Sequence, residues 1–333
     1  MAVFKPENVE DFYEIREVLG SGHFGQVRRV CERTSGTCWA AKFMKLRKNA
    51  CSRLGLERSS VEREVEILQA VQHPNIVTLK DVFESRAEVV LILELVSGGE
   101  LFDFIAEKEN LLESEAIEFM KQILAGLGFM HSKNIAHFDL KPENIMLSDK
   151  VSSHPNVKLI DFGLAYFFNQ GEEYRSTSGT PQYIAPEVIN CEPLSTACHS
   201  CCVLSVLRLS GLSPFQGETN EETLRNIIAM KYDFDERYFS TTSSMAKDFI
   251  EKLLVKNPKY YIIFIAVICF QPITRKQVTN RNRSSINMKT FKKFNARRKW
   301  KVSLDMYRQC ESDVEDTESK PASLLRRRLS SSS

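Results

Sequence analysis

Residues 137–144 constrain what this chain can fold into more than any other stretch. They read HFDLKPEN, which places a carboxylate, an ammonium and a carboxamide at fixed spacing. Asp161 follows in a DFG triplet, directly after an apolar run that contains one lysine. Two loops of this kind suit magnesium-bound phosphates held beside a hydroxyl group. The pair predicts phosphoryl transfer and argues against the alternative, a polar turn in an unrelated α/β protein.

Each polar side chain of these loops has an expected task in that chemistry. Asp139 would orient the attacking hydroxyl and accept its proton, and Lys141 would neutralise charge on the transferred phosphoryl group. Asn144 and Asp161 would hold the metal ions. The expected cofactors are therefore ATP and Mg²⁺.

A glycine-rich stretch near the N-terminus supplies a second phosphate-binding pattern. Glycine lets backbone amides approach phosphate oxygens without obstruction by a side chain. Dehydrogenases that bind dinucleotides share the spacing, but there the loop opens a helix and an acid follows about twenty residues later. Here a second strand is expected to follow, and the marker beyond it is a lysine, Lys42, which argues against a dehydrogenase. The predicted nucleotide contacts in this stretch are Leu19, Gly20, Ser21, Gly22, His23, Phe24, Gly25, Gln26 and Val27.

Composition bounds the class of protein without choosing a partner. The chain has 333 residues, 43% of them hydrophobic, enough for two modest domains or one large two-lobed domain. Its 45 basic and 43 acidic residues nearly cancel, so net charge says nothing about binding of nucleic acid, although local clusters of charge can. We expect no nucleic-acid partner. The polar start and the nine cysteines favour a reducing, cytoplasmic location over a secreted disulfide framework. The apolar run 260–270 is too short to span a membrane.

Taken together, the motifs GxGxxGxV, AAK, HFDLKPEN, DFGLA and APE resemble those of calmodulin-regulated protein kinases. Residues 91–104, 135–147 and 232–236, with the basic stretch 45–53, narrow the resemblance to the death-associated protein kinase family. That family has a two-lobed α+β fold. The resemblance implies a small antiparallel β-sheet lobe and a larger, mainly helical lobe.

The resemblance covers residues 9–256 and 287–333, and it implies both boundaries and function. We expect a calcium/calmodulin-regulated serine/threonine kinase of cell-death or autophagy signalling, acting on protein substrates with basic residues near the acceptor. The expected segments are an N-terminal extension (1–12), a kinase domain (13–273) divided into small lobe (13–93), hinge (94–98) and large lobe (99–273), an autoinhibitory and calmodulin-binding segment (274–309) and a disordered regulatory tail (310–333).

Roles for further residues follow from the same resemblance. Lys42 would hold the α- and β-phosphates while Glu64 pairs with it. Leu93 would be the gatekeeper, and the backbone of Glu94 and Val96 would meet the adenine edge. The other implied contacts of the nucleotide are Ala40, Glu100, Glu143, Met146 and Ile160.

Phe138 stands where this motif usually has an arginine. Such an arginine would normally be neutralised by a phosphate on the activation segment. Its replacement predicts a weaker dependence on that phosphate.

Near the C-terminus, aromatic residues alternate with basic ones, the composition of a helix that calmodulin grips. A solvated basic helix or a nucleic-acid patch is the alternative reading of this segment taken alone. Ser303 resembles the inhibitory autophosphorylation site of the family. Ser330 follows three arginines, so a phosphorylated tail could bind a 14-3-3 protein, and the resemblance also implies self-association as a homodimer. The predicted calmodulin anchors are Phe291, Phe294, Trp300, Val302 and Leu304.

Two stretches, 195–210 and 258–272, depart from the family pattern. The family has an aspartate followed by Met-Trp-Ser in the long helix after APE, whereas residues 195–203 read STACHSCCV. The arginine expected to pair with Glu187 is also missing, which predicts an unpaired carboxylate and low stability. An error in the gene model accounts for both departures; a pseudokinase or scaffold is the alternative. The cysteines of 195–203 lack a second ligand pair, which argues against zinc.

Overall fold

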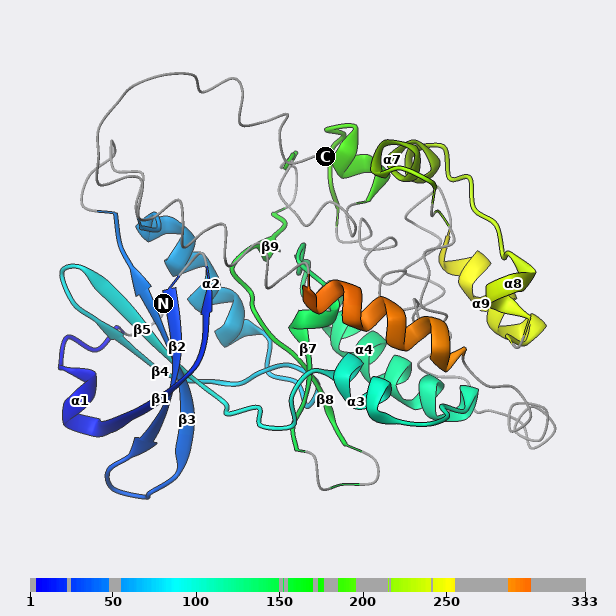
Figure 1. Cartoon of the computed structure of the whole chain (residues 1–333). Helices are drawn as coiled ribbons and strands as arrows, with labels where there is room; N and C mark the ends of the chain where they lie inside the picture. The colour runs from blue at the N-terminus through cyan, green and yellow to red at the C-terminus, as the bar shows by residue number, and fades with distance from the viewer. Residues whose placement is uncertain are drawn as a thin grey trace, which may run out of the picture.

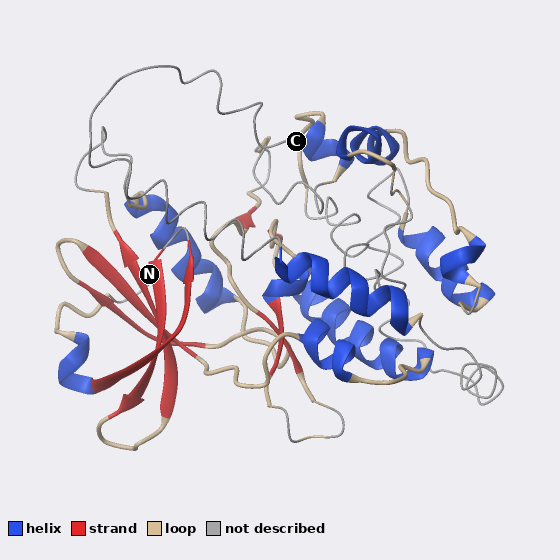
Figure 2. Ribbon diagram, in the orientation of Figure 1, coloured by secondary structure: helices blue, strands red, loops and turns tan. Residues whose placement is uncertain are grey.

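The computed structural model describes residues 4–22, 25–47, 55–149, 152, 155–169, 173–176, 185–195, 215, 217–240, 242–254 and 287–300. These residues form a sheet-rich small lobe and a mainly helical large lobe, as Figures 1 and 2 show. The predicted two-lobed α+β fold is therefore confirmed. Several residues and stretches singled out in the sequence lie outside the described part: His23, Phe24, Val302, Ser303, Leu304, Ser330, 196–210 and 258–272.

The small lobe is built on a five-stranded antiparallel sheet of order β1-β2-β3-β5-β4. A hairpin joins β1 to β2 where Gly22 faces Gly25. Gly25 has a φ of 137°, and a Cβ there would lie 1.8 Å from the carbonyl oxygen of Phe43, so only glycine fits. The strands are β1 (Tyr13–Gly22), β2 (Gly25–Glu32), β3 (Cys38–Lys45), β4 (Leu79–Glu84) and β5 (Glu88–Leu93).

Helix α2 (Arg58–Ala70) covers this sheet because its apolar residues recur at helical spacing. Val61, Val65 and Leu68 are buried along one stripe and pack with residues of β3, β4 and β5. Glu64 lies on the same buried side and is 4% exposed. The stripe thus carries one carboxylate into the space between helix and sheet. The short helix α1 (Val9–Phe12) precedes β1.

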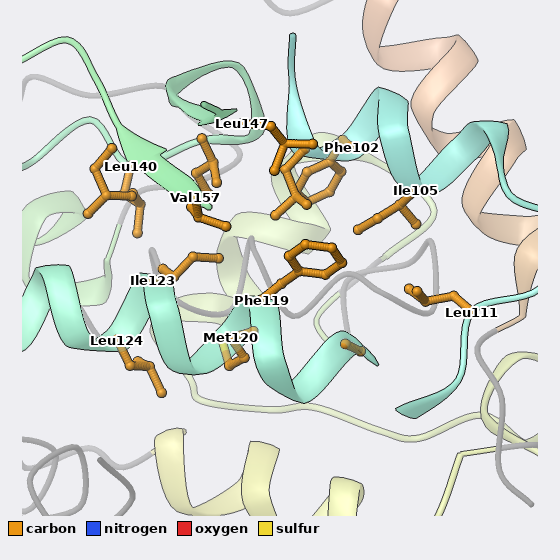
Figure 3. Packing of buried hydrophobic residues seen from close by; sticks show 14 of the residues in the cluster. Phe102, Ile105, Leu111, Phe119, Met120, Ile123, Leu124, Leu140, Leu147 and Val157 are labelled. Atoms are coloured by element: carbon orange, nitrogen blue, oxygen red, sulfur yellow. The ribbon is translucent and has the colours of Figure 1, made fainter. Parts of the chain in front are cut away.

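The large lobe begins with α3 (Leu101–Glu107) and the long α4 (Glu113–Ser132), which enclose a fully apolar core. Figure 3 shows Phe102, Phe119 and Ile123 meeting Leu147 and Val157 in this core. The later elements are β6 (Ile135–Ala136), the 3-10 turn η1 (Pro142–Asn144), β7 (Ile145–Leu147), β8 (Val157–Leu159), β9 (Tyr166–Phe167), α5 (Pro186–Ile189), α7 (Asn220–Ile228), α8 (Glu236–Phe239) and α9 (Ser244–Leu253).

Residues 288–300 form a further helix, which we call the C-terminal helix; it is orange in Figure 1 and lies along α3. Phe291 is fully buried, and its ring stacks on Phe102 of α3 with 5.5 Å between centroids. Asn295 donates to Asp103 of α3 at 2.9 Å. The basic segment of the sequence is therefore packed against the large lobe.

Backbone hydrogen bonds attach the chain near the boundary of the two lobes to both sides of the paired strands β7 and β8. On one side the amide of Val77 donates to Leu159, and the amide of Leu159 donates to Asn75, at 3.0 and 2.9 Å. On the other side the amide of Gly98 donates to Leu147 at 2.9 Å. The segments near residues 75–77 and near residue 98 are therefore hydrogen-bonded to opposite sides of this hairpin.

Two expectations require correction. The cysteines were not expected to form disulfides, but Cys31 and Cys38 face each other across β2 and β3 and are bonded. Directly opposed residues of antiparallel strands bring their Cβ atoms close enough for such a bond. Glu187 was expected to be buried without a partner, yet it is partly exposed and does make a polar interaction. Its burial therefore gives no ground for low stability.

No helix in the described ranges is long and apolar enough to cross a membrane. In those same ranges, no cluster of three or more His, Cys, Asp and Glu side chains is placed to hold a metal ion.

Candidate active site

His137 joins the two loops that the sequence singled out. Its side chain is fully buried, and Nε2 donates to the carbonyl of Ile160 at 3.0 Å while Nδ1 accepts from the amide of Asp139 at 3.3 Å. Burial lowers the pKa of His137 below its ordinary value. A neutral imidazole can serve both bonds at once, because one nitrogen donates and the other accepts. The histidine thus fixes the catalytic loop against the segment before DFG.

Asp139, Lys141 and Asn144 form one compact polar group. Lys141 Nζ lies 2.6 Å from Asp139 Oδ2. Asn144 donates through Nδ2 to the Asp139 carbonyl at 2.8 Å and to its carboxylate at 3.1 Å. Asn144 is placed by the tight turn η1, which Pro142 starts. The structure therefore brings together Asp139 and Lys141, expected to act on the hydroxyl and the phosphoryl group, and Asn144, expected to hold a metal ion.

Lys42 connects the small lobe to the second loop. Its Nζ lies 2.7 Å from Glu64 on α2 and 3.1 Å from Asp161. Burial alone would lower the pKa of Lys42, but Glu64 and Asp161 raise it above the ordinary lysine value. For Asp161, burial would raise the pKa, but Lys42 outweighs it and the pKa is lowered. Lys42 and Asp161 are therefore both charged at neutral pH.

Asp161 has a φ of 61°, a left-handed conformation that costs a non-glycine residue energy. The neighbouring Phe162 is 1% exposed, and its ring lies 4.9 Å from that of His137. Packing of the phenylalanine thus holds the carboxylate in its strained position beside Lys42.

The other expected nucleotide contacts gather along the boundary between the lobes. Ala40 and Leu93 face each other across β3 and β5, and Glu100 forms a bridge with Met146. The side chain of Glu94 pairs with Lys158 of the large lobe, with 2.9 Å between Nζ and Oε2. The expectation for Glu94 concerned only its backbone and stays a prediction.

An arginine of the C-terminal helix occupies the acidic edge of this site. Arg298 Nη2 lies 2.6 Å from Glu100 and Nη1 lies 2.9 Å from Glu143, while the guanidinium is 5.8 Å from the ring centre of Phe102. Its side chain is only 5% exposed. Burial would lower the pKa of Arg298, but Glu143 and Glu100 raise it. Two acids expected to meet a nucleotide or a substrate thus already hold a cation.

Sequence reasoning did not single out Arg298 as a site residue. In the structure the buried residues 288, 291, 295 and 298 recur at helical spacing along one stripe, but only Met288 and Phe291 of these are apolar, so hydrophobic spacing did not reveal Arg298. The predicted anchors, in contrast, do not share a face: Phe291 is fully buried, Phe294 is partly buried and Trp300 is 70% exposed.

Comparison with known proteins places these features in a family. Residues 13–262 match the model of the protein kinase domain. Death-associated protein kinase 2 of Mus musculus is 48% identical over 360 residues, covering 100% of this chain and 97% of that protein. The protein of the same name from Homo sapiens is 47% identical with the same coverage.

Solved structures of a Caenorhabditis elegans protein are also similar. A twitchin kinase fragment, described as an autoregulated protein kinase with immunoglobulin domains, has a TM-score of 0.80 at 37% identity, covering 91% of this chain and 66% of that chain. A twitchin kinase region has a TM-score of 0.79 at 36% identity, covering 90% and 52%.

Proposed function

The chain belongs to the death-associated protein kinase family and is a serine/threonine protein kinase; from that premise we propose how its residues carry out and regulate transfer of the ATP γ-phosphoryl group. The observation that carries the proposal is the formed Lys42–Glu64 pair beside Asp161. This pair and the DFG aspartate must both be in place for transfer. In the structure they are in contact.

The residues fit the cofactors that protein kinases use, ATP and Mg²⁺. Magnesium prefers oxygen ligands and is usually held by one or two carboxylates together with phosphates and water. Asp161 supplies a carboxylate, and Asn144 retains its carbonyl oxygen because its amide nitrogen is engaged by Asp139. When bound, the metal would neutralise charge that develops between the β- and γ-phosphates.

The chain's own side chains would then divide the remaining work. Lys42 would hold the α- and β-phosphates, because Glu64 keeps its ammonium charged and in position. Asp139 would orient the acceptor hydroxyl and take its proton. Its carboxylate is held in place by Lys141, whose Nζ lies 2.6 Å from Oδ2. Lys141 would offset charge on the moving phosphoryl group.

We further propose that the C-terminal helix holds the enzyme inactive until calcium–calmodulin removes it. Arg298 engages Glu100, which would meet the ribose or a substrate arginine, and Glu143, an expected nucleotide contact. Phe291 is an expected calmodulin anchor but is buried on α3, so calmodulin cannot bind Phe291 while the helix is docked. Binding therefore has to shift the population toward the undocked state. The autoregulated twitchin kinase offers a precedent in a related structure.

Because two relatives carry the name death-associated protein kinase 2, we propose a role in cell-death or autophagy signalling for this chain. Homodimerisation and a 14-3-3 site at Ser330 stay predictions.

The test measures transfer to a serine peptide with nearby arginines, in the full chain, with and without calcium–calmodulin. We expect low basal turnover, an increase with calmodulin, and loss of transfer in Asp139→Asn. The fluorescence of exposed Trp300 should shift to shorter wavelength on binding, with Trp39→Phe used to isolate its signal. Turnover in Asp139→Asn equal to the parent would refute the catalytic assignment. Calmodulin binding without any rise in turnover would refute autoinhibition alone.

A further inference from the structure

Four aromatic side chains pack together beside the catalytic loop; we call Phe138, Tyr166, Phe168 and Tyr174 the aromatic cluster. The rings of Tyr166 and Tyr174 are stacked, with centroids 3.7 Å apart and planes inclined by 16°. Tyr174 lies 5.7 Å from Phe138 and 6.0 Å from Phe168, measured between ring centroids. Tyr174 therefore contacts each of the other three rings.

The cluster reaches α2 through a cation. The guanidinium of Arg63 lies 5.6 Å from the ring centre of Tyr166. Arg63 directly precedes Glu64, the residue that pairs with Lys42. A displacement of Tyr166 would thus act on the turn of α2 that carries the phosphate-site carboxylate.

At its other end the cluster reaches the proposed base. Phe138 directly precedes Asp139 and has a φ of 58°, which is unfavourable for a residue with a side chain. Its ring packs with Phe168 and Tyr174. It also packs against a further apolar cluster of the large lobe, which includes Val188 and Leu194. Packing of this kind is what can hold a strained backbone beside a reacting group.

The backbone under the rings is also fixed. Tyr166 belongs to β9, which pairs with β6, and the amide of Phe168 donates to Asn134 at 2.8 Å. Tyr174 accepts from the amide of Leu194 at 2.8 Å. Three separate stretches therefore meet at the cluster on defined hydrogen bonds.

We propose that Tyr174 is a positioning residue, whose ring holds α2 and the catalytic loop in the relation that phosphoryl transfer requires. Its contact with Tyr166 supports the side of Arg63 and Glu64, and its contact with Phe138 supports the side of Asp139. The contacts of Tyr174 with Tyr166 and Phe138 are made by aromatic rings and involve no phosphate group. The apolar ring, rather than the hydroxyl, performs the positioning.

The test compares Tyr174→Ala, Tyr174→Phe and Arg63→Ala in the full chain with calcium–calmodulin present. Phe167→Ala is the matched control, because that ring lies between two cluster residues in sequence but is 44% exposed. We expect Tyr174→Ala to lower kcat about tenfold and Arg63→Ala about threefold. Tyr174→Phe and Phe167→Ala should stay within about twofold of the parent. The KM for peptide should hardly change, because Glu100 and Glu143 lie outside the cluster.

Two further readouts separate positioning from general damage. The double variant of Arg63 and Tyr174 should lose about tenfold rather than about thirtyfold, because both residues act through Tyr166. Hydrogen exchange, which needs no enzyme activity, should speed up in α2 of Tyr174→Ala and stay unchanged in β4.

The proposal is overturned if Tyr174→Phe falls as far as Tyr174→Ala, or if the effects of the two single variants multiply. It is equally overturned if Tyr174→Ala keeps the parent's exchange in α2. Because the exchange measurement does not depend on turnover, it decides the matter even where Tyr174→Ala is inactive for another reason.

Discussion

Lys42 and Arg298 are both largely buried cations, and they differ in the element that carries them. Lys42 contacts two carboxylates and Arg298 contacts three. The side chain of Lys42 is 12% exposed and belongs to β3, which lies between β2 and β5 inside the sheet. That of Arg298 is 5% exposed and belongs to the C-terminal helix, whose other face is exposed at Lys292, Arg297 and Trp300. The first cation can leave only if the small lobe unfolds, whereas the second can leave with its helix.

The difference lies in what happens to the carboxylates. If the ammonium of Lys42 is removed, Glu64 stays 5% exposed, and an unpaired buried charge is costly. When the C-terminal helix leaves, it uncovers Glu100 and Glu143 at the same time, so water can solvate them. A buried ion pair can therefore be part of a reversible switch when the helix that carries the cation is also the element that shields the carboxylates from water.

Lys42→Ala should have the largest effect on this comparison. We expect turnover to fall by roughly 10²–10³-fold or more, because a fixed charge on the phosphates is lost. The matched control is Lys45→Ala, an exposed lysine on the same strand, which should leave turnover unchanged. Steady-state phosphorylation of a peptide measures both. Parent-like turnover in Lys42→Ala would show that the lysine is not on the phosphates.

Arg298→Ala should have the opposite effect, raising turnover without calmodulin by about tenfold. Removing one partner of a buried charge pair weakens docking by about 2 kcal/mol or more, which shifts the population toward the undocked helix. The matched control is Arg297→Ala, which removes the same charge from the exposed face. If both variants raise turnover equally, net charge rather than the buried pair controls docking.

Lys299 gives a smaller test of the same surface. Its ammonium contacts Asp103, but its side chain is 50% exposed. Exposed ion pairs contribute little, so we expect Lys299→Ala to change basal turnover by about twofold at most.

His131 is also a buried ionisable group, but unlike Lys42 and Arg298 it is neutral. Burial lowers the pKa of His131 to about 4. Its ordinary pKa is near 6.5, so the unfolded chain binds a proton as pH falls from 6.5 toward 4 while the folded chain does not. Stability is therefore greatest above pH 6.5 and decreases on acidification. Between pH 7.5 and 5.5 the parent should lose about 1 kcal/mol more than His131→Gln, measured by urea unfolding.

The catalytic centre could be predicted because its residues lie in short motifs. Asp139, Lys141 and Asn144 fall within one loop, and Asp161 within one triplet, so local sequence places them. The pairing of Lys42 with Glu64 was correctly expected, but only from the family register, since α2 offers other glutamates on its surface.

What the sequence did not reveal depends on contacts between distant segments. Arg298 was counted only among the basic residues of the expected calmodulin-binding segment, because nothing in the local sequence shows that Glu100 and Glu143 face its side of the helix. Tyr174 belongs to a polar stretch, and its ring partners lie on two other segments, at Phe138 and at Tyr166 and Phe168. The bond between Cys31 and Cys38 could not be predicted without knowing the register in which β2 pairs with β3.

The hairpin of β7 and β8 has a mechanical consequence. The chain near the boundary of the lobes is hydrogen-bonded to it on both sides, at Val77 and Asn75 on one and at Gly98 on the other. Each attachment fixes the distance between the hairpin and the segment bonded to it. The lobes should therefore keep a constant separation beside this hairpin, and any movement between them should be largest at residues far from it.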